Sequence, residues 1–370
     1  MDLIGKGLDA LDTPCMLVDL DRLQQNIEHM AAIARQAGVK LRPHVKTHKV
    51  PEIARMQLAA GACGITVAKL DEAEVFAAHG CTDIFQAYTV VGEHKWRHAA
   101  ELAQRIRLTV GADSREALRG LSAAATAAGS SIGIRIEVDT GLHRAGVSPD
   151  GAQALCEETL RLPGLDLDGL FTFRGPRFAG AGDRSLAELG RQEGETLVAL
   201  AEALRARGIP IREVSAGGTP TGPHVAQVQG ITEIRPGTYV FMDNMQINMG
   251  VCAPEAVALH ILCTVVSRPA LDLATIDGGS KTFCGDVPPG GTYNLRGYGT
   301  ADGRDIFVQG MSEEHGVLKL GPGEAPRVGD RLPMIPNHVC TTVNLSDALI
   351  GVRGGRVAQV WPILARGKRQ

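Results

Sequence analysis

A short stretch rich in cationic side chains, Arg42-Pro-His-Val-Lys-Thr-His-Lys49, is the first part of the sequence that could do chemistry. It places two lysines, Lys46 and Lys49, among arginine and histidine. Neighbouring positive charge and partial burial both disfavour an ammonium group, so we expect a lowered lysine pKa here. A lysine tuned in this way can form a Schiff base with a carbonyl compound. A solvated basic turn, or an anion site that uses lysine as a point charge, is the alternative interpretation.

Paired glycines and threonines form a second such stretch, Ser215-Ala-Gly-Gly-Thr-Pro-Thr221. Glycines let backbone N–H groups approach an anion closely and the threonine hydroxyls add donors, so the stretch suits a phosphate group. A plain Gly/Pro turn is the alternative. Together, a lysine nucleophile and a phosphate cradle favour pyridoxal phosphate, because its aldehyde and its phosphate need those two fixtures.

His338 and Cys340 stand two positions apart. We expect them on the same face of a strand, where an imidazole nitrogen and a thiolate sulfur would suit a borderline-soft cation such as zinc. An ordinary buried pair is the alternative. The cysteines as a group are scattered with no CxxC pair, and we expect most of them to be small buried hydrophobic residues in a reducing compartment.

The composition is that of an ordinary globular protein: 44% of the 370 residues are hydrophobic, 21% are charged, and the formal net charge is −3. No global field would attract nucleic acid or an anionic membrane. No segment has ~18 uninterrupted apolar residues, and no basic region precedes an apolar one near residue 1. We therefore expect a cytoplasmic protein with no membrane or nucleic-acid partner, which acts on small molecules and associates with further copies of itself.

From Leu20 to about Gly250 the sequence alternates strand-like and helical patterns. The first of eight short strands ends at Lys46, and the others are expected at 64–67, 83–88, 107–110, 132–138, 169–173, 213–215 and 238–242. This is the repeat of a parallel (β/α)8 barrel. An open doubly wound sheet is the alternative, but no GxGxxG motif opens a helix after a strand. Barrel enzymes commonly bind phosphate after strands seven and eight, which is where Gly217 and Gly218 stand.

After about Gly250 short strand patterns are separated by Gly/Pro turns without helical periodicity, which predicts a mostly antiparallel β domain. The strand pattern at Thr13 to Val18 is not needed for the barrel, so we expect it to pair with that domain. Two domains are expected because single cores seldom exceed ~250–300 residues. The predicted division is a cofactor-binding barrel at 20–250 and a β domain made of 1–19 and 251–370.

Six segments of the chain, taken in order, carry a family resemblance. They are Arg42-Pro-His-Val-Lys-Thr-His-Lys49, Asp139-Thr-Gly-Leu-His-Arg-Ala-Gly-Val147, Gly217-Gly-Thr-Pro-Thr221, Pro236-Gly-Thr-Tyr-Val-Phe-Met-Asp243, Ser312-Glu-Glu-His-Gly316 and Pro336-Asn-His-Val-Cys-Thr-Thr-Val-Asn344. Together they resemble the D-threonine aldolase/D-serine dehydratase family over nearly the whole chain. The resemblance implies an α/β protein of the alanine-racemase-like fold, active as a homodimer whose sites are completed by the partner's β domain.

The resemblance also implies roles for individual residues. Lys46, the first lysine of the RPHxKTHK pattern, would be the Schiff-base lysine. Arg144, from the DxGxxRxGV pattern, would contact the pyridoxal ring; it keeps its charge and so favours an anionic phenolic oxygen. A surface salt bridge is the alternative for this arginine. The phosphate would be held by Gly217, Gly218 and Thr219, with Tyr239 nearby.

In this family the place of His338 and Cys340 holds a metal that contacts the substrate's 3-hydroxyl group. Aldolase members have His-x-Asp there and D-serine-dehydratase-like members have His-x-Cys, which is the pattern of this chain. We expect zinc as the divalent metal, with manganese and magnesium as alternatives.

The chain departs from the family at Leu170-Phe-Thr-Phe-Arg-Gly-Pro-Arg177. The family often ends this strand in a tyrosine followed by a Gly-His-like turn, so a general acid or base from this loop would be absent or moved. Arg174 and Arg177 would be either solvated loop charges or a grip for a second substrate carboxylate, as bidentate arginines provide.

These observations lead us to expect a pyridoxal-phosphate- and divalent-metal-dependent lyase that acts on a D-3-hydroxy amino acid. The expected reaction is dehydration and deamination to a 2-oxo acid and ammonia, as in D-serine dehydratase. The first alternative is retro-aldol cleavage to glycine, or another small amino acid, and an aldehyde, as in D-threonine aldolase. A racemase would need a second acid-base residue and no metal pair, and a non-catalytic cofactor carrier would need only the barrel.

Overall fold

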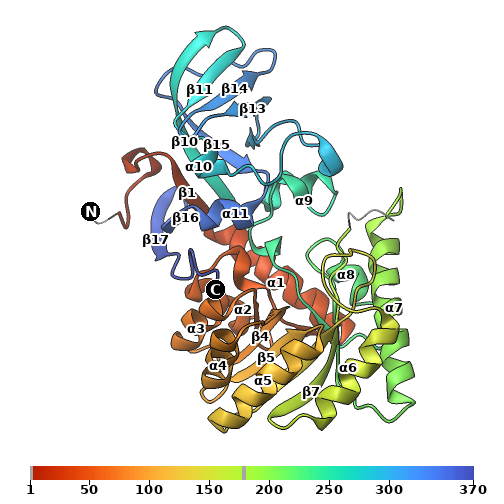
Figure 1. The fold of residues 1–370 in the computed structure, drawn as a ribbon. Helices are drawn as coiled ribbons and strands as arrows, with labels where there is room; N and C mark the ends of the chain where they lie inside the picture. The colour runs from red at the N-terminus through yellow and green to blue at the C-terminus, as the bar shows by residue number, and fades with distance from the viewer. Residues whose placement is uncertain (1–2, 177–180) are drawn as a thin grey trace. The chain divides into compact units, whose positions relative to one another are not determined.

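The computed structural model describes residues 3–176 and 181–370, which fold into two compact units. The β unit comprises Met1–Glu28, Thr47–Glu52 and Thr238–Gly367, and the barrel unit comprises His29–Lys46, Ile53–Gly237 and Lys368–Gln370. Figure 1 shows the ribbon, coloured along the chain.

In the described part of the barrel unit, eight parallel strands form one sheet. They are β2 (Lys40–Leu41), β3 (Ile65–Val67), β4 (Asp83–Thr89), β5 (Arg107–Ala112), β6 (Ile132–Glu137), β7 (Leu165–Phe171), β8 (Glu213–Ala216) and β9 (Glu233–Ile234). Their order is β2-β9-β8-β7-β6-β5-β4-β3, and a parallel bridge between His44 and Thr66 joins its two ends. The Thr66 N–H donates a 2.7 Å hydrogen bond to the Pro43 carbonyl there, so the sheet closes and the predicted (β/α)8 barrel is confirmed.

Helices connect successive strands, because a parallel pair needs a long crossover. They are α1 (Leu20–Ala37), α2 (Pro51–Ala59), α3 (Leu70–Ala78), α4 (Glu93–Leu102), α5 (Arg115–Ala128), α6 (Pro149–Arg161), α7 (Leu186–Arg205) and the short α8 (Gly222–Val225). Serine side chains cap α5, α6 and α7 by accepting a backbone N–H, and Ser185 and Glu188 form a complete capping box. In Figure 1, α3 to α6 lie outside the strands. None of the helices in residues 3–176 and 181–370 is long and apolar enough to cross a membrane.

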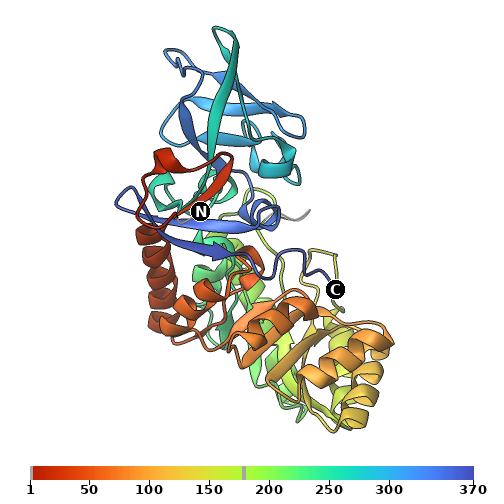
Figure 2. The ribbon, with the colours of Figure 1, turned by 90° about the vertical axis from the view of Figure 1, so that its left-hand side faces the viewer.

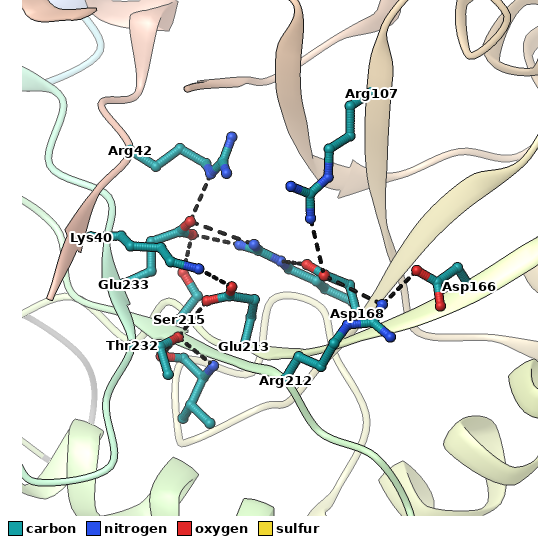
Figure 3. Close-up of polar contacts among 12 residues, drawn as sticks. Lys40, Arg42, Arg107, Asp166, Asp168, Arg212, Glu213, Ser215, Thr232 and Glu233 are labelled. Atoms are coloured by element: carbon teal, nitrogen blue, oxygen red, sulfur yellow. Dashed lines mark hydrogen bonds and ion pairs between the residues drawn. The ribbon is translucent and has the colours of Figure 1, made fainter. Parts of the chain in front are cut away.

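Charged side chains fill the barrel at the amino ends of its strands (Figure 3). Glu233, which opens β9, lies 2.7 Å from Arg42 Nε and 2.5 Å from Arg135 Nη1. Arg135 Nε in turn lies 2.7 Å from Asp168 Oδ2. Burial opposes the charge of Glu233, but the two guanidinium groups hold its pKa well below the usual range. Each of these buried charges has an opposite partner, which buried ions require.

Aromatic rings follow this network toward the carboxyl ends of the strands. Phe85 and Phe171 pack edge to face with ring centroids 5.1 Å apart. The Phe85 ring contacts the Arg135 guanidinium at 4.5 Å and that of Arg235, just after β9, at 5.8 Å. Gly111 on β5 leaves room for the Phe171 ring, because a Cβ there would lie 2.7 Å from its tip. The barrel interior is thus layered, with paired ions first and then aromatic rings.

The described part of the β unit holds a nine-stranded sheet (Figure 2). Its strands are β1 (Cys15–Asp19), β10 (Leu259–Ala270), β11 (Leu273–Ile276), β12 (Gly299–Ala301), β13 (Ile306–Met311), β14 (Gly316–Leu320), β15 (Arg331–Pro336), β16 (Ala348–Arg353) and β17 (Arg356–Pro362). Every pair of neighbours is antiparallel except β1 and β16. β1 lies between β10 and β16, so the expectation that the segment Thr13 to Val18 pairs with the C-terminal strands is confirmed.

Two expectations about local structure are wrong. The eighth barrel strand is β9 (Glu233–Ile234), whereas the apolar segment expected there forms the 3-10 helix η3 (Thr238–Val240). The sequence pattern did not predict β9 because its inward residue, Glu233, is charged. The arginines that neutralise it, Arg42 and Arg135, lie far away in the sequence. The β unit also contains short helices that periodicity did not predict, namely α9 (Asn244–Asn248), α10 (Ser280–Phe283) and α11 (Val339–Asn344).

Candidate active site

Lys46 and Lys49 have different surroundings although both belong to the basic stretch. Lys46 lies in the 3-10 helix η2 (Val45–Thr47), beyond the end of β2 at Leu41 rather than in the strand itself, and its side chain is exposed. Lys49 is 7% exposed, and its Nζ donates a 3.3 Å hydrogen bond to the Ala365 carbonyl. A lysine that reacts with an aldehyde needs an accessible Nζ, so the exposure of Lys46 fits the predicted role better.

The glycine-threonine loop, Gly217–Thr221, turns directly from β8 into α8. Gly217 has a φ of +80°, and a Cβ there would lie 2.9 Å from the Cα of Gly222. A Cβ on Gly218 would lie 3.0 Å from the Phe173 ring. Glycine is therefore favoured at both positions, and neither position carries a Cβ that would hold an anion away from the backbone.

Thr219 and Tyr239 belong to different units. Thr219 is buried, and its Oγ1 accepts a 3.2 Å hydrogen bond from the Gly237 N–H within the barrel unit. Tyr239 is fully buried in η3 and belongs to the β unit. Its predicted place near the phosphate stays a prediction.

The ring of Phe173 links two of the predicted cofactor residues within the barrel unit. Arg144 is exposed in the loop after β6, and its guanidinium carbon lies 5.4 Å from the centroid of the Phe173 ring. The same ring packs against Gly218. Phe173 is itself 38% exposed. The barrel therefore brings Arg144 and the glycine-threonine loop to one partly open aromatic surface at the carboxyl ends of its strands.

Glu137 is a carboxyl group in this region that the sequence analysis did not single out. It is the last residue of β6 and is 7% exposed, yet no ion pair or hydrogen bond to its carboxylate is found among residues 3–176 and 181–370. Burial and then the charge of Asp113 raise the pKa of Glu137 to about 7, against the opposing effect of Arg144. A carboxyl group with such a pKa can gain or lose a proton near neutral pH.

Arg174 lies in the loop after β7, and Arg177 falls outside the described residues. The buried guanidinium of Arg174 donates to the Leu189 carbonyl of α7, and its backbone N–H donates a 2.9 Å hydrogen bond to Glu193. Glu193 also accepts a 3.1 Å hydrogen bond from the Thr221 hydroxyl. One buried carboxylate thus ties the base of this loop to the glycine-threonine loop. The predicted grip of Arg174 and Arg177 on a substrate carboxylate stays a prediction.

His338 and Cys340 lie at the start of α11 and not in a strand, so that part of the expectation is wrong. β15 ends at Pro336, and His338 is the residue that precedes the helix. Cys340 nonetheless lies near enough to His338 to help raise the pKa of its imidazole. Cys340 Sγ also lies 3.3 Å from the hydroxyl of Thr47, the residue next to Lys46 in the chain. The fold therefore brings the two potential donor atoms together.

Asp286 contacts this pair from the loop after α10. Its Oδ2 lies 2.7 Å from His338 Nδ1, while its Oδ1 accepts hydrogen bonds from Thr341 Oγ1 at 2.8 Å and from Cys284 Sγ at 3.0 Å. Burial opposes ionisation, but the hydrogen bond to His338 lowers the pKa of Asp286 to about 2. Burial likewise opposes the charge of His338, but Cys340 and Asp286 raise its pKa well above the usual range.

The residues present fit both groups that the resemblance implies. An exposed lysine and a loop without intervening side chains suit an aldehyde and a phosphate, as pyridoxal phosphate carries. An imidazole and a thiol close to each other offer the nitrogen and sulfur donors that zinc binds. Across residues 3–176 and 181–370 no group of three or more His, Cys, Asp or Glu side chains is arranged around a metal position. A cation held by His338 and Cys340 would keep open positions, as catalytic metals do.

Comparison with known proteins decides the family. The model of the alanine racemase N-terminal domain matches residues 18–245, and that of a putative serine dehydratase domain matches residues 258–352. A D-threo-3-hydroxyaspartate dehydratase of Delftia sp. (strain HT23) is 37% identical over 95% of this chain and 97% of its own. The chain belongs to the D-threonine aldolase/D-serine dehydratase family.

Other members of the family agree in sequence and fold. A D-threonine aldolase of Arthrobacter sp. is 36% identical over 98% of this chain and 95% of its own. The solved D-threonine aldolase of Filomicrobium marinum superposes with a TM-score of 0.90 at 32% identity, covering 99% of each chain. A D-threo-3-hydroxyaspartate dehydratase with a TM-score of 0.88 at 36% identity, over 97% of this chain and 99% of its own, is a cysteine-to-alanine variant in the metal-free form. The predicted alanine-racemase-like fold is confirmed.

Sequence reasoning missed Glu137 and Asp286 for different reasons. Glu137 had a usable signal, because a charged residue ends β6 (Ile132–Glu137), and the carboxyl ends of barrel strands carry active sites. Asp286 had no local signal, because its partner His338 follows 52 residues later.

Proposed function

We propose that this protein is a pyridoxal-phosphate- and divalent-metal-dependent lyase that dehydrates and deaminates a D-3-hydroxy amino acid, giving a 2-oxo acid and ammonia. Its named relatives are dehydratases and aldolases, which are all lyases. The observation that carries the choice of dehydration is the spacing of His338 and Cys340, since the resemblance assigns His-x-Cys to the dehydratase-like members.

Each group of residues would have a separate task. When bound, pyridoxal phosphate withdraws electrons from the substrate's α carbon and a divalent metal polarises its 3-hydroxyl group. Lys46 would hold the cofactor's aldehyde and, once released from it, take the proton from the α carbon with its Nζ. Arg144 would face the cofactor ring. The phosphate would be bound by Gly217, Gly218 and Thr219, with Tyr239 nearby.

The proposal assigns cofactor binding to residues 20–250 and metal binding to the β domain made of 1–19 and 251–370. His338 and Cys340 would hold the metal, and we favour zinc because manganese and magnesium prefer oxygen ligands. Arg174 and Arg177 would bind a second carboxylate of the substrate if it carries one, and the relatives named for activity on 3-hydroxyaspartate support such a substrate class.

Retro-aldol cleavage to glycine and an aldehyde is the second candidate. The observation in its favour is that the D-threonine aldolase of Arthrobacter sp. is 36% identical to this chain, against 37% for the dehydratase. Both reactions use the same cofactor and metal, and they differ in the bond that breaks.

One assay separates these candidates. The protein with pyridoxal phosphate and zinc is incubated with a panel of D-3-hydroxy amino acids, including D-serine, D-threonine and D-threo-3-hydroxyaspartate. We expect 2-oxo acid and ammonia in equal amounts. Glycine with an aldehyde would establish the aldolase instead, and the absence of every product would refute both.

The lysine assignment has its own test. Borohydride reduction of the cofactor-loaded protein, followed by peptide mass spectrometry, should place the reduced adduct on Lys46. An adduct on the buried Lys49 would contradict the assignment.

The proposal includes a cytoplasmic homodimer that acts on a small molecule. Light scattering of the active protein should give twice the 39.1 kDa mass of the chain. A fully active monomer would contradict this part of the proposal.

A further inference from the structure

The strongest unexplained arrangement in the molecule is the set of contacts around Asp286 in the β unit. This carboxylate contacts His338 and also Thr341 and Cys284, so both of its oxygens are occupied. Three of the roughly four acceptor sites of a carboxylate are thus used by protein donors. Its contacts therefore indicate a role exerted through the histidine.

We propose that Asp286 is the positioning residue of the metal centre, which fixes the ring of His338 so that Nε2 is the nitrogen presented to the metal. The inference deepens the proposed function and rests on it. An ionised carboxylate can only accept hydrogen bonds, so the 2.7 Å contact at Nδ1 places the ring proton on that nitrogen. In the neutral ring that binds a metal, the lone pair then belongs to Nε2, and a metal-bound histidine needs this arrangement.

The carboxylate is held in the direction that this role requires. Thr341 lies on α11, the helix that also carries Cys340 and that His338 precedes. Its hydroxyl donates to Asp286 Oδ1 at 2.8 Å, so Asp286 is tied to the same short segment as both predicted ligands. Rotation of the imidazole would break the contact at Nδ1 while the carboxylate stayed in place.

Cys284 is the second residue that holds the Asp286 carboxylate in place, and its own backbone conformation is strained. Its Sγ lies 3.0 Å from Asp286 Oδ1 and 3.1 Å from the Thr341 hydroxyl. The residue has φ +60° and ψ 165°, a conformation that favours glycine. Retaining a side chain there is consistent with a use for the thiol, and the contacts identify that use as holding Asp286.

The β unit contains a matched control for this carboxylate. Asp302 Oδ2 lies 3.1 Å from His260 Nε2, so it is also an aspartate paired with a histidine. Neither residue contacts His338 or Cys340 in the described part of the chain. Asp302→Asn therefore removes the same kind of charge from the same unit without touching the proposed centre.

The test measures zinc affinity by competition with a chromophoric chelator, on metal-free wild-type protein and on Asp286→Asn and Asp302→Asn. We expect Asp286→Asn to bind zinc about 10–100-fold more weakly, the usual cost of losing such a partner. Asp302→Asn should match the wild type. Cobalt(II) at saturation should still give a sulfur-to-cobalt charge-transfer band in Asp286→Asn, because Cys340 is intact, and pyridoxal phosphate binding should be unchanged.

Equal zinc affinity of Asp286→Asn and wild type would overturn this inference while leaving the proposed function in place. A wild-type protein that binds no zinc, cobalt or manganese would overturn the metal part of the proposed function and the inference with it. If Asp286→Asn does not fold, Cys284→Ala serves as the second variant, because it removes one anchor and keeps the carboxylate. It should weaken zinc binding by less than Asp286→Asn would, and unchanged binding would count against the proposal.

Discussion

The two ends of the barrel differ in whether their buried charged side chains form ion pairs. At the amino ends of the strands Glu233, Arg42 and Arg135 are buried and paired at 2.5–2.7 Å (Figure 3). At the carboxyl ends Glu137, Arg144 and Arg235 form no ion pair within 4.0 Å among the residues that the structure describes. Arg235 is buried, and desolvation lowers its pKa to about 10.

This difference separates a structural region from a functional one. Buried ions that satisfy each other hold strands in place and have no capacity left for a ligand. Charges without an opposite charge at the end of the barrel where active sites lie can take one from a ligand. Arg235 meanwhile donates hydrogen bonds to the Ser215 hydroxyl and to the Thr172 carbonyl. The contrast predicts that substitutions at the amino ends affect unfolding, whereas those at the carboxyl ends affect cofactor binding and its pH dependence.

The largest expected effect comes from Glu233→Gln. The change leaves Arg42 and Arg135 without their shared counter-ion, and we expect a loss of about 3–5 kcal/mol in the free energy of unfolding, measured by urea denaturation. The folded pKa of Glu233 is depressed, so its stabilisation is present above the unfolded pKa of ~4.3 and is lost as pH falls below it. The variant should therefore lack this part of the acid-induced loss.

Asp166→Asn is the matched control for that prediction. Asp166 pairs with Arg212 at the rim, where the two side chains are 59% and 47% exposed, so the loss should stay below about 1 kcal/mol. Similar losses in both variants would remove the distinction between the buried network and surface pairs.

Gly217→Ala should have the next largest effect, at the other end of the barrel. The new Cβ would lie 2.9 Å from Gly222 Cα at a φ of +80°, so the loop must shift. We expect about 1–3 kcal/mol of destabilisation. We also expect pyridoxal phosphate to bind at least about tenfold more weakly, measured by titrating the cofactor into the protein and following absorbance. Gly208→Ala is the control, because its φ is +79° with nothing within 4 Å of the new Cβ. Unchanged cofactor affinity in Gly217→Ala would remove this loop from the cofactor site.

Glu137→Gln should have the smallest effect, confined to pH dependence. Because the folded pKa of about 7 lies above the unfolded value of ~4.3, the folded protein binds the extra proton between these values. Wild-type stability should therefore fall as pH rises from ~4.5 to ~7. The variant should lack this slope in urea denaturation at a series of pH values. Glu195→Gln, on the exposed face of α7, is the control and should keep the wild-type dependence of stability on pH. If Glu137→Gln also keeps it, Glu137 does not titrate in this pH range.

The sequence was informative where function depends on neighbouring residues. The alternation of strand and helix patterns predicted the barrel, and the Gly217-Gly218 pair and the His338/Cys340 pair were visible as short motifs. The eighth strand was missed because Glu233 is a charged residue inside the barrel, where an apolar one is expected. The arginines that neutralise it lie 98 and 191 residues away in the sequence. A local sequence pattern cannot predict ion pairs over such a separation.

The place of His338 was misjudged for a related reason. Apolar residues continue from β15 into α11, so the pattern resembles one long strand, while the turn depends on Asn337, whose side-chain amide donates to the carbonyls of Val287 and Gly297. Those acceptors lie 50 and 40 residues earlier in the chain. Tertiary contacts of this kind override local propensity, and they also position Asp286.

The central place of β1 in the nine-stranded sheet has a consequence for how the protein is made. Residues Cys15–Asp19 leave the ribosome long before their neighbours β10 and β16, which begin at Leu259 and Ala348. The barrel segments in between can fold while the nascent chain is still growing, whereas β1 has no strand partner until β10 is synthesised and keeps one edge open until β16 follows. A chain stalled or truncated before β16 would thus carry an apolar strand with one open edge, which makes it a natural target for chaperones and a risk for aggregation during expression.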